Sequence, residues 1–272
     1  MTTTQRSDTP PGAPPWPLAV PAGVAALFLL APLVGLVIRA PWRELPRVLA
    51  DAQAVQALRL SLVTASAATV VSLVLGVPLA WVLARASFRG LTLLRALVTL
   101  PLVLPPVVGG VALLLAFGRR GFLGRYLDLW FGLTVPFSTV AVVVAEAFVA
   151  MPFLVVTVEG ALRSADLGLE EAAATLGSSP MATFRRVTLP LVGSSLAAGS
   201  VLCWARALGE FGATITFAGN LPGVTQTMPL AVYRAFETDP ESAVALSLVL
   251  LVVSVAVLAL LRDRWLRPGA VP

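Results

Sequence analysis

Three ionisable side chains, Glu146, Arg206 and Glu210, lie inside otherwise apolar stretches of the sequence. Such a residue in a membrane-spanning helix is costly unless it is paired or hydrated, and it therefore marks a functional site by default. Arg206 and Glu210 are four residues apart and share one helix face, which predicts an ion pair. Glu146 is expected to hydrogen-bond to a neighbouring helix. The functional alternative for all three is a place on a transport pathway or at a subunit interface.

Missing residue types exclude whole chemistries. All 19 basic residues are Arg, and the sequence has neither Lys nor His. A Walker A loop and a Schiff-base enzyme both require Lys, while Ser-His, Cys-His and HExxH sites require His. The single cysteine, Cys203, has apolar neighbours and is expected to be buried by packing. We therefore expect neither catalysis nor a metal site, and no cofactor, on this chain.

Composition indicates a membrane protein. Of the 272 residues, 58% are hydrophobic and 12% charged, against about 25% charged in ordinary soluble domains. The net charge of +5 comes from Arg clusters between apolar runs, a pattern typical of contacts with lipid phosphates rather than nucleic acid.

The apolar runs predict an all-α membrane protein with six transmembrane helices. A disordered tail (1–17) and a C-terminal tail (267–272) flank the membrane domain (18–266). Prolines at 101, 105 and 106 predict a kink in the third helix, with a flexible gate element as the alternative. The expected helices are Leu18–Ile38, Leu58–Leu83, Leu91–Phe117, Phe137–Val158, Leu191–Ala218 and Ala243–Leu261.

The polar insertion at about 159–190 predicts two short helices on one side of the membrane. Asp166 is a suitable N-cap for the first, and Gly177 suits a left-handed stop after it. Ser179 and Pro180 are typical of the start of a second helix, which we expect to end before Pro190.

The same insertion carries a sequence signature. Residues 171–190 read Glu-Ala-Ala-x3-Gly-x9-Val-x-Leu-Pro. This run resembles the EAA loop of ABC-importer membrane subunits, which is cytoplasmic and docks into a cleft on an ATPase subunit. The resemblance implies a type I ABC importer permease fold and assigns ATPase coupling to Glu171, Ala172, Ala173, Gly177, Val187, Leu189 and Pro190.

A second stretch narrows the resemblance. Residues 205–233 contain Ala-Arg-Ala-Leu-Gly-Glu-Phe-Gly and then Gly-Asn-Leu-Pro-Gly-Val-Thr-Gln-Thr-Met-Pro-Leu-Ala-Val-Tyr. The run is similar to the molybdate/sulfate class of permeases, closest to the molybdate branch. In an oxyanion path, hydroxyl groups and backbone N–H groups would face the ion, which makes Thr214, Thr216 and Asn220 candidates. Gly209 and Gly212 suit either close helix packing or a path, and the sequence leaves both open.

The resemblance also implies partners and a location. They are a second copy of the chain, two P-loop ATPase subunits that bind ATP and Mg, an extracytoplasmic oxyanion-binding protein and the lipid bilayer. The chain is expected in the bacterial inner membrane with both termini cytoplasmic.

Three other functions fit parts of the sequence. A sulfate/thiosulfate permease fits the same motifs. A secondary transporter driven by an ion gradient could use Glu146, Arg206 and Glu210, but it leaves the EAA loop unexplained. A membrane enzyme would have to rely on carboxylates alone.

Overall fold

A computed structural model describes residues 16–265, and every regular element in that range is a helix. The predicted tail 1–17 lies outside these residues except for Trp16 and Pro17, where α1 begins, and the tail 267–272 lies wholly outside. The elements are α1 (Trp16–Ile38), α2 (Leu45–Ala50), α3 (Ala52–Arg85), α4 (Leu91–Val103), α5 (Pro106–Phe117), α6 (Gly124–Phe131), α7 (Thr139–Ser164), α8 (Leu167–Thr175), α9 (Pro180–Thr183), the π-helical turn η1 (Phe184–Thr188), α10 (Leu189–Leu191), α11 (Gly193–Leu208), α12 (Gly212–Phe217), α13 (Met228–Thr238) and α14 (Pro240–Trp265).

Within the described residues, four helices are long and apolar enough to cross a membrane on their own: α1, α3, α7 and α14. Two further spans are broken pairs, with a bend of 119° between α4 and α5 and of 74° between the segment 180–191 and α11. The predicted six spans are thus present only when each bent pair counts as one. The third is broken far more sharply than the kink that we expected.

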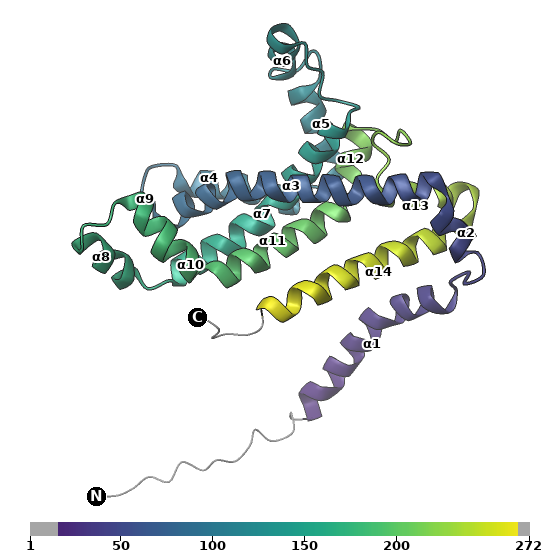
Figure 1. Ribbon diagram of the computed structural model, residues 1–272, viewed down its shortest axis with the longest axis horizontal. Coiled ribbons are helices and arrows are strands. Elements are labelled where there is room, and N and C mark those ends of the chain that lie inside the picture. The colour runs from purple at the N-terminus through teal and green to yellow at the C-terminus, as the bar shows by residue number, and fades with distance from the viewer. Residues whose placement is uncertain (1–15, 266–272) are drawn as a thin grey trace, which may run out of the picture.

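The core forms where α3, α7 and α11 lie side by side (Figure 1). One face of α3 carries small residues at helical spacing, including Ala65, Ala68 and Gly76, and this face packs closely on α7. A Cβ atom on Gly76 would lie 3.2 Å from the Val155 side chain. Small residues thus let two membrane helices approach closely.

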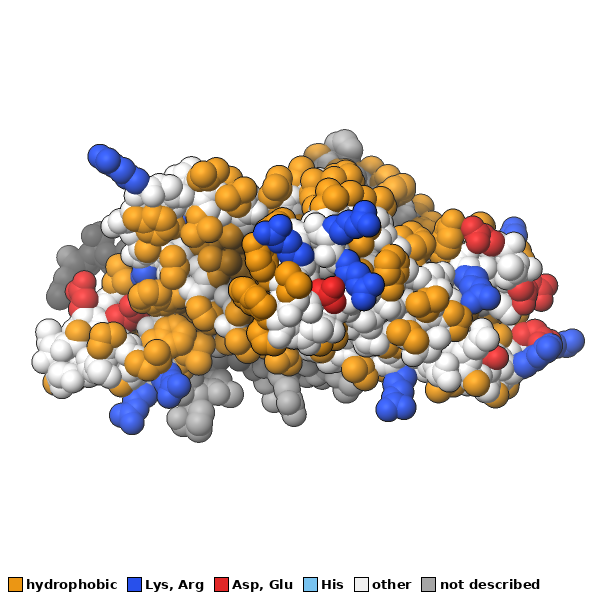
Figure 2. Space-filling model, turned by 90° about the horizontal axis from the view of Figure 1, so that it is seen from above, with side chains coloured by type: hydrophobic (Ala, Val, Ile, Leu, Met, Phe, Trp, Pro, Cys, Tyr) orange, Lys and Arg blue, Asp and Glu red, His pale blue; other side chains and the backbone are white. Residues whose placement is uncertain are grey.

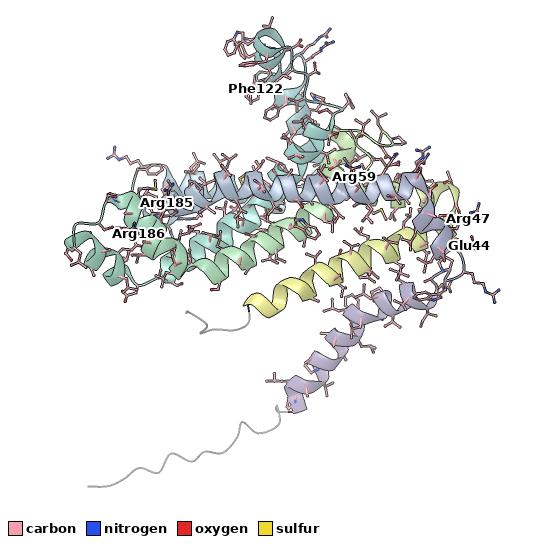
Figure 3. All side chains as sticks on the ribbon, in the orientation of Figure 1. Glu44, Arg47, Arg59, Phe122, Arg185 and Arg186 are labelled. Carbon is pink, nitrogen blue, oxygen red and sulfur yellow. The ribbon has the colours of Figure 1, made fainter. Side chains whose placement is uncertain are left out.

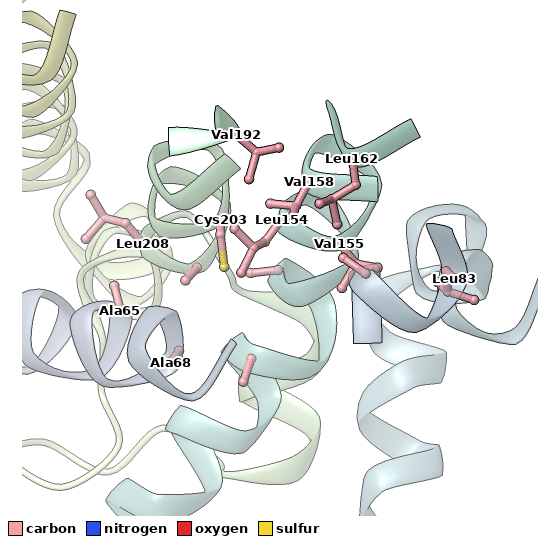
Figure 4. Close-up of a cluster of buried hydrophobic side chains, with 14 residues drawn as sticks. Ala65, Ala68, Leu83, Leu154, Val155, Val158, Leu162, Val192, Cys203 and Leu208 are labelled. Carbon is pink, nitrogen blue, oxygen red and sulfur yellow. The ribbon is translucent and has the colours of Figure 1, made fainter. Parts of the chain in front are cut away.

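Cys203 lies at the centre of this core with no exposed surface, beside Leu154 on α7 (Figure 4). Its predicted role as a buried packing residue is confirmed.

Helix α5, the second half of the first broken pair, packs on α12, which follows α11 in the chain. Together α5 and α12 leave the main layer of helices, with α6 at the tip (Figure 1). The predicted fifth span, Leu191–Ala218, is correspondingly not one helix: it breaks between Leu208 and Gly212. Gly209 and Gly212 flank this break, and the sequence alone left open whether they serve helix packing or a path.

Candidate functional site

The polar insertion folds as a helical elbow, which we define as residues 166–191. Asp166 caps α8 by accepting a hydrogen bond from the Gly168 amide at 2.9 Å. Gly177 ends the helix with φ of +81°, in the left-handed region that favours glycine. Ser179 then caps α9 by accepting a hydrogen bond from the Ala182 amide. The predicted helix–turn–helix and its three punctuating residues are confirmed.

The end of the second helix was predicted wrongly. We expected it to stop before Pro190, but the helical path runs through Pro190 and ends at Leu191. The π-helical turn η1 lies directly before it, and the Leu189 amide bonds to the Phe184 carbonyl five residues back. A π turn changes the hydrogen-bond register, which allows a helix to continue through a residue that lacks an amide N–H.

An ion pair that sequence reasoning missed fixes the elbow to the membrane helices. Arg85, the last residue of α3, contacts Glu170 of α8 with 2.8 Å between Nη2 and Oε1. The same Glu170 oxygen accepts a hydrogen bond from the Thr188 hydroxyl at 3.1 Å. One carboxylate therefore joins α3, the first elbow helix and the second elbow helix. Only the position of Arg85 at a helix end could have suggested this in the sequence.

The outer face of the elbow is open. Glu171 and Ala172 are exposed on α8, beside Leu176, which is 88% exposed. Between the two elbow helices lies a pocket of about 320 Å³ whose walls include Glu170, Glu171 and Pro180. The remaining motif residues are placed as follows: Ala173, Val187 and Leu189 half-buried, Gly177 and Pro190 exposed.

Two arginines add positive charge beside this face. Arg185 and Arg186 lie on η1 and are exposed (Figure 3). The elbow therefore exposes a carboxylate, small residues, apolar side chains and a basic turn.

The predicted pair of Arg206 and Glu210 is present. Nη1 of Arg206 lies 2.6 Å from Oε2 of Glu210. The Glu210 side chain is 1% exposed and that of Arg206 is 27% exposed. The other Glu210 oxygen accepts a hydrogen bond from the Ala213 amide at 2.8 Å. Glu210 thus sits in the break between α11 and α12, neutralises Arg206 and satisfies an amide at the start of α12.

Glu146 makes the predicted contact with a neighbouring helix. Its Oε1 atom accepts a hydrogen bond from the Thr64 hydroxyl of α3 at 2.9 Å. Both residues are buried in the contact between α3 and α7.

The three hydroxyl and amide candidates have different surroundings. Thr216 donates to the Gly212 carbonyl within α12, and Asn220 accepts a hydrogen bond from the Gln226 side chain. The Thr214 hydroxyl is fully buried and has no hydrogen-bond partner among the described residues 16–265.

Glycines set the contact between α5 and α12. A Cβ atom on Gly110 would lie 2.7 Å from the Thr216 Cβ and 2.8 Å from the Ala213 carbonyl oxygen. One on Gly212 would lie 2.9 Å from Pro106. Gly212 therefore allows close packing of α12 on α5. The sequence alone left open whether this glycine serves helix packing or a transport path. A Cβ on Gly209 would meet only the Ala205 carbonyl, at 3.6 Å.

A further ion-pair cluster was also missed. Glu159, near the end of α7, contacts Arg95 of α4 at 2.8 Å and Arg163 at 3.2 Å. Arg95 also donates a hydrogen bond to the Leu83 carbonyl of α3. This cluster joins three helices at the end of the membrane layer that carries the elbow.

Comparison with known proteins agrees with this architecture. The family of binding-protein-dependent transport system inner membrane components matches residues 72–269. The chain is 50% identical over 248 residues to the molybdenum transport system permease protein ModB of Mycobacterium tuberculosis, covering 91% of this chain and 93% of that protein. It is 38% identical over 236 residues to the sulfate transport system permease protein CysT of Salmonella typhimurium, covering 85% of each chain.

The fold also matches a solved structure. A crystal structure of a bacterial ABC transporter involved in the import of the polysaccharide alginate has a chain that superposes with a TM-score of 0.73, covering 92% of this chain and 93% of that one at 16% identity. The predicted type I permease fold is confirmed, and so is a transport subunit rather than an enzyme. The chain belongs to the family of binding-protein-dependent transport system inner membrane components and is a multi-pass inner-membrane subunit of an ABC importer.

Proposed function

We propose that this chain is the permease subunit of an importer that carries molybdate into the cytoplasm. The observation that carries the proposal is the 50% identity to a molybdenum permease along nearly the whole chain, against 38% to a sulfate permease. A sulfate/thiosulfate permease is the alternative.

The elbow supplies the coupling to ATP hydrolysis. Two P-loop ATPase subunits bind ATP and Mg²⁺, and each receives one elbow in a surface cleft. The small side chains of Ala172 and Ala173 allow close approach of a partner backbone, and Glu171 beside them is an exposed carboxylate. Because Glu170 joins the elbow to Arg85 of α3, movement of the docked elbow pulls on the membrane helices.

The complete transporter contains two copies of this chain. One copy supplies six spans, which form half of a pathway at a two-fold axis. Both termini lie in the cytoplasm with the elbow, and an extracytoplasmic binding protein delivers the ion on the opposite side.

The ion passes between the two copies through polar groups of the broken spans. Thr216 and Asn220 are partly exposed and are the stronger lining candidates, ahead of Thr214, whose hydroxyl is fully buried within this chain. Arg206 is held by Glu210 and therefore does not offer an unpaired positive charge that would trap a dianion. Selection among tetrahedral dianions rests with the closed pocket of the binding protein.

Uptake in proteoliposomes tests the substrate. The reconstituted complex with its binding protein should take up molybdate, with competition by tungstate and little by sulfate. Saturable sulfate uptake that excess molybdate leaves unchanged would reassign the chain to the sulfate branch.

Substitution of the elbow tests the coupling. Glu171→Lys reverses an exposed charge, so the permease should keep its thermal stability but lose the ATPase during co-purification. Thr175→Lys, an exposed position on the same helix outside the motif, is the matched control. Normal co-purification and transport by the Glu171 variant would contradict the coupling role.

A further inference from the structure

The tip of the molecule carries an aromatic face, formed by Tyr126, Trp130 and Phe131 of α6, that the other described residues leave uncovered. Helix α6 packs mainly on α5 and projects from the layer of long helices (Figure 1). Leu129, Trp130 and Phe131 are 77%, 72% and 67% exposed, and Phe122 before the helix is 68% exposed. Figure 3 labels Phe122 on this projecting arm.

The arm is held rigidly. A Cβ atom on Gly124 would lie 2.0 Å from the Gly118 carbonyl oxygen, and one on Gly121 would lie 2.5 Å from that of Ala116. The Leu123 amide bonds back to the Ala116 carbonyl at 3.0 Å. Because only glycine fits this turn, α6 has a fixed direction relative to α5 and presents its aromatic face in one orientation.

Positive charge accompanies the aromatic side chains. Arg119 lies 3.7 Å from Asp128, which offsets its charge. Arg120 is exposed and forms no ion pair within residues 16–265. The Arg125 guanidinium stacks 4.5 Å from the centre of the Tyr126 ring, whose centre lies 5.3 Å from that of Trp130. From above, charged side chains are grouped within a hydrophobic surface (Figure 2).

This combination fits the boundary between lipid headgroups and acyl chains. Trp and Tyr concentrate at that level of a bilayer, where Arg side chains reach lipid phosphates. In α6, Tyr126 and Trp130 share one side of the helix, while Leu129 lies beside Arg125. Helix α6 comes immediately before the spanning helix α7 and α8 comes immediately after it, so α6 and the elbow lie on opposite sides of the membrane.

We propose that α6 is an interfacial anchor, whose aromatic face enters the headgroup boundary of the leaflet opposite the elbow while Arg120 and Arg125 bind lipid phosphates. The anchor sets the depth of the α5–α12 unit, because the glycine turn transmits the position of α6 to α5.

Depth-dependent quenching tests the anchor in the full transporter. Leu129→Cys is labelled with an environment-sensitive fluorophore, since Cys203 is fully buried. Phe131→Cys provides a second position, and Leu176→Cys on the exposed elbow is the aqueous control. The complex is reconstituted in vesicles of phosphatidylcholine and phosphatidylglycerol that carry a nitroxide either near the headgroup or deep in the acyl chain.

The shallow nitroxide should quench the α6 labels about twofold more strongly than the deep one, while aqueous iodide quenches only the Leu176 label. Iodide quenching of both α6 labels to the same degree as the control would overturn the proposal. Protection from every quencher, with energy transfer between labels on the two copies, would overturn it in favour of a contact between subunits.

A separate experiment tests whether α6 recognises lipid headgroups. A shallow nitroxide on phosphatidylglycerol should quench the Leu129 label more strongly than one on phosphatidylcholine, and Arg120→Gln should reduce the excess about fivefold. Equal quenching by the two lipids with Arg120 present would contradict phosphate binding by this residue.

Discussion

The elbow end of the membrane domain and the projecting α5–α12 unit hold their helices together by different means. At the elbow end, charged side chains join separate helices: Glu170 contacts Arg85, and Glu159 contacts Arg95. In the projecting unit, α5 and α12 touch through backbone and Cβ atoms around Gly110 and Gly212.

This difference assigns different mechanical roles. An ion pair between two side chains can exchange partners when another protein supplies a charge. A contact between helix backbones has no such alternative, because its geometry depends on the absence of a side chain. A docked partner can therefore change the contacts of the elbow, whereas α5 and α12 move together as one unit.

The largest expected effect comes from adding one carbon to the backbone contact. Gly110→Ala places a Cβ atom 2.7 Å from Thr216 and 2.8 Å from a carbonyl oxygen, which should destabilise the fold by about 3 kcal/mol. A lower midpoint of thermal unfolding in detergent measures it.

Gly160 on α7 is the matched control for that change. A Cβ atom there meets nothing within 4 Å, so Gly160→Ala should stabilise the helix by up to about 1 kcal/mol. Equal effects of the two substitutions would show that the α5–α12 contact is not tight.

Features that depend on contacts between residues close together in the sequence could be predicted. Asp166, Gly177 and Ser179 punctuate the elbow through contacts within four positions, and their roles could be predicted from short-range rules. The pair of Arg206 and Glu210 was predictable for the same reason.

Features that depend on contacts between residues far apart in the sequence could not be predicted. The 119° bend between α4 and α5 depends on where α5 finds α12, about a hundred residues further on. Arg85 and Glu170 are 85 positions apart, so neither residue identifies the other. The sequence does not single out Gly110, because its tight contact with α12 is visible only in the folded structure.

The next effect concerns the charge pair between these two regions. Arg206→Ala leaves Glu210 at 1% exposure without its counter-ion. The cost should be about 2 kcal/mol, below the roughly 3–5 kcal/mol of a fully buried pair because Arg206 is partly exposed.

Glu210→Ala should cost less stability than Arg206→Ala, because the Arg206 side chain can turn toward polar surroundings. The double variant should cost less than the sum of the two single changes. Strict additivity in thermal unfolding would argue against an energetic pair.

A smaller effect is expected at the elbow itself. Glu170→Gln removes the charge beside Arg85 and Thr188 but keeps an oxygen that can accept their hydrogen bonds, so it should cost about 1 kcal/mol. Faster hydrogen exchange of the α8 amides measures the loss, with α13 as the internal reference. Exchanging the charges, with Arg85→Glu and Glu170→Arg together, should restore part of the protection. Unchanged hydrogen exchange in the Glu170→Gln variant would show that Glu170 does not hold the elbow to the membrane helices.

The smallest effect lies at the opposite end, where Asp239 caps α14. Its carboxylate accepts hydrogen bonds from the hydroxyl and amide of Ser242, and these bonds lower the pKa of Asp239 from its ordinary value. A carboxyl group with a lowered pKa in the folded state contributes stability above its unfolded pKa, and this stability is lost as pH falls through the folded pKa.

Wild-type protein should therefore lose slightly more stability on acidification below about pH 4 than Asp239→Asn, which keeps an oxygen acceptor without a titrating charge. Because Asp239 is exposed, the difference should be a small shift in the midpoint of unfolding, visible only as a difference between the two pH profiles. Parallel profiles across that range would mean that the charge of Asp239 does not contribute to the cap, and that α14 is held by its packing on α13, α11, α1 and α2.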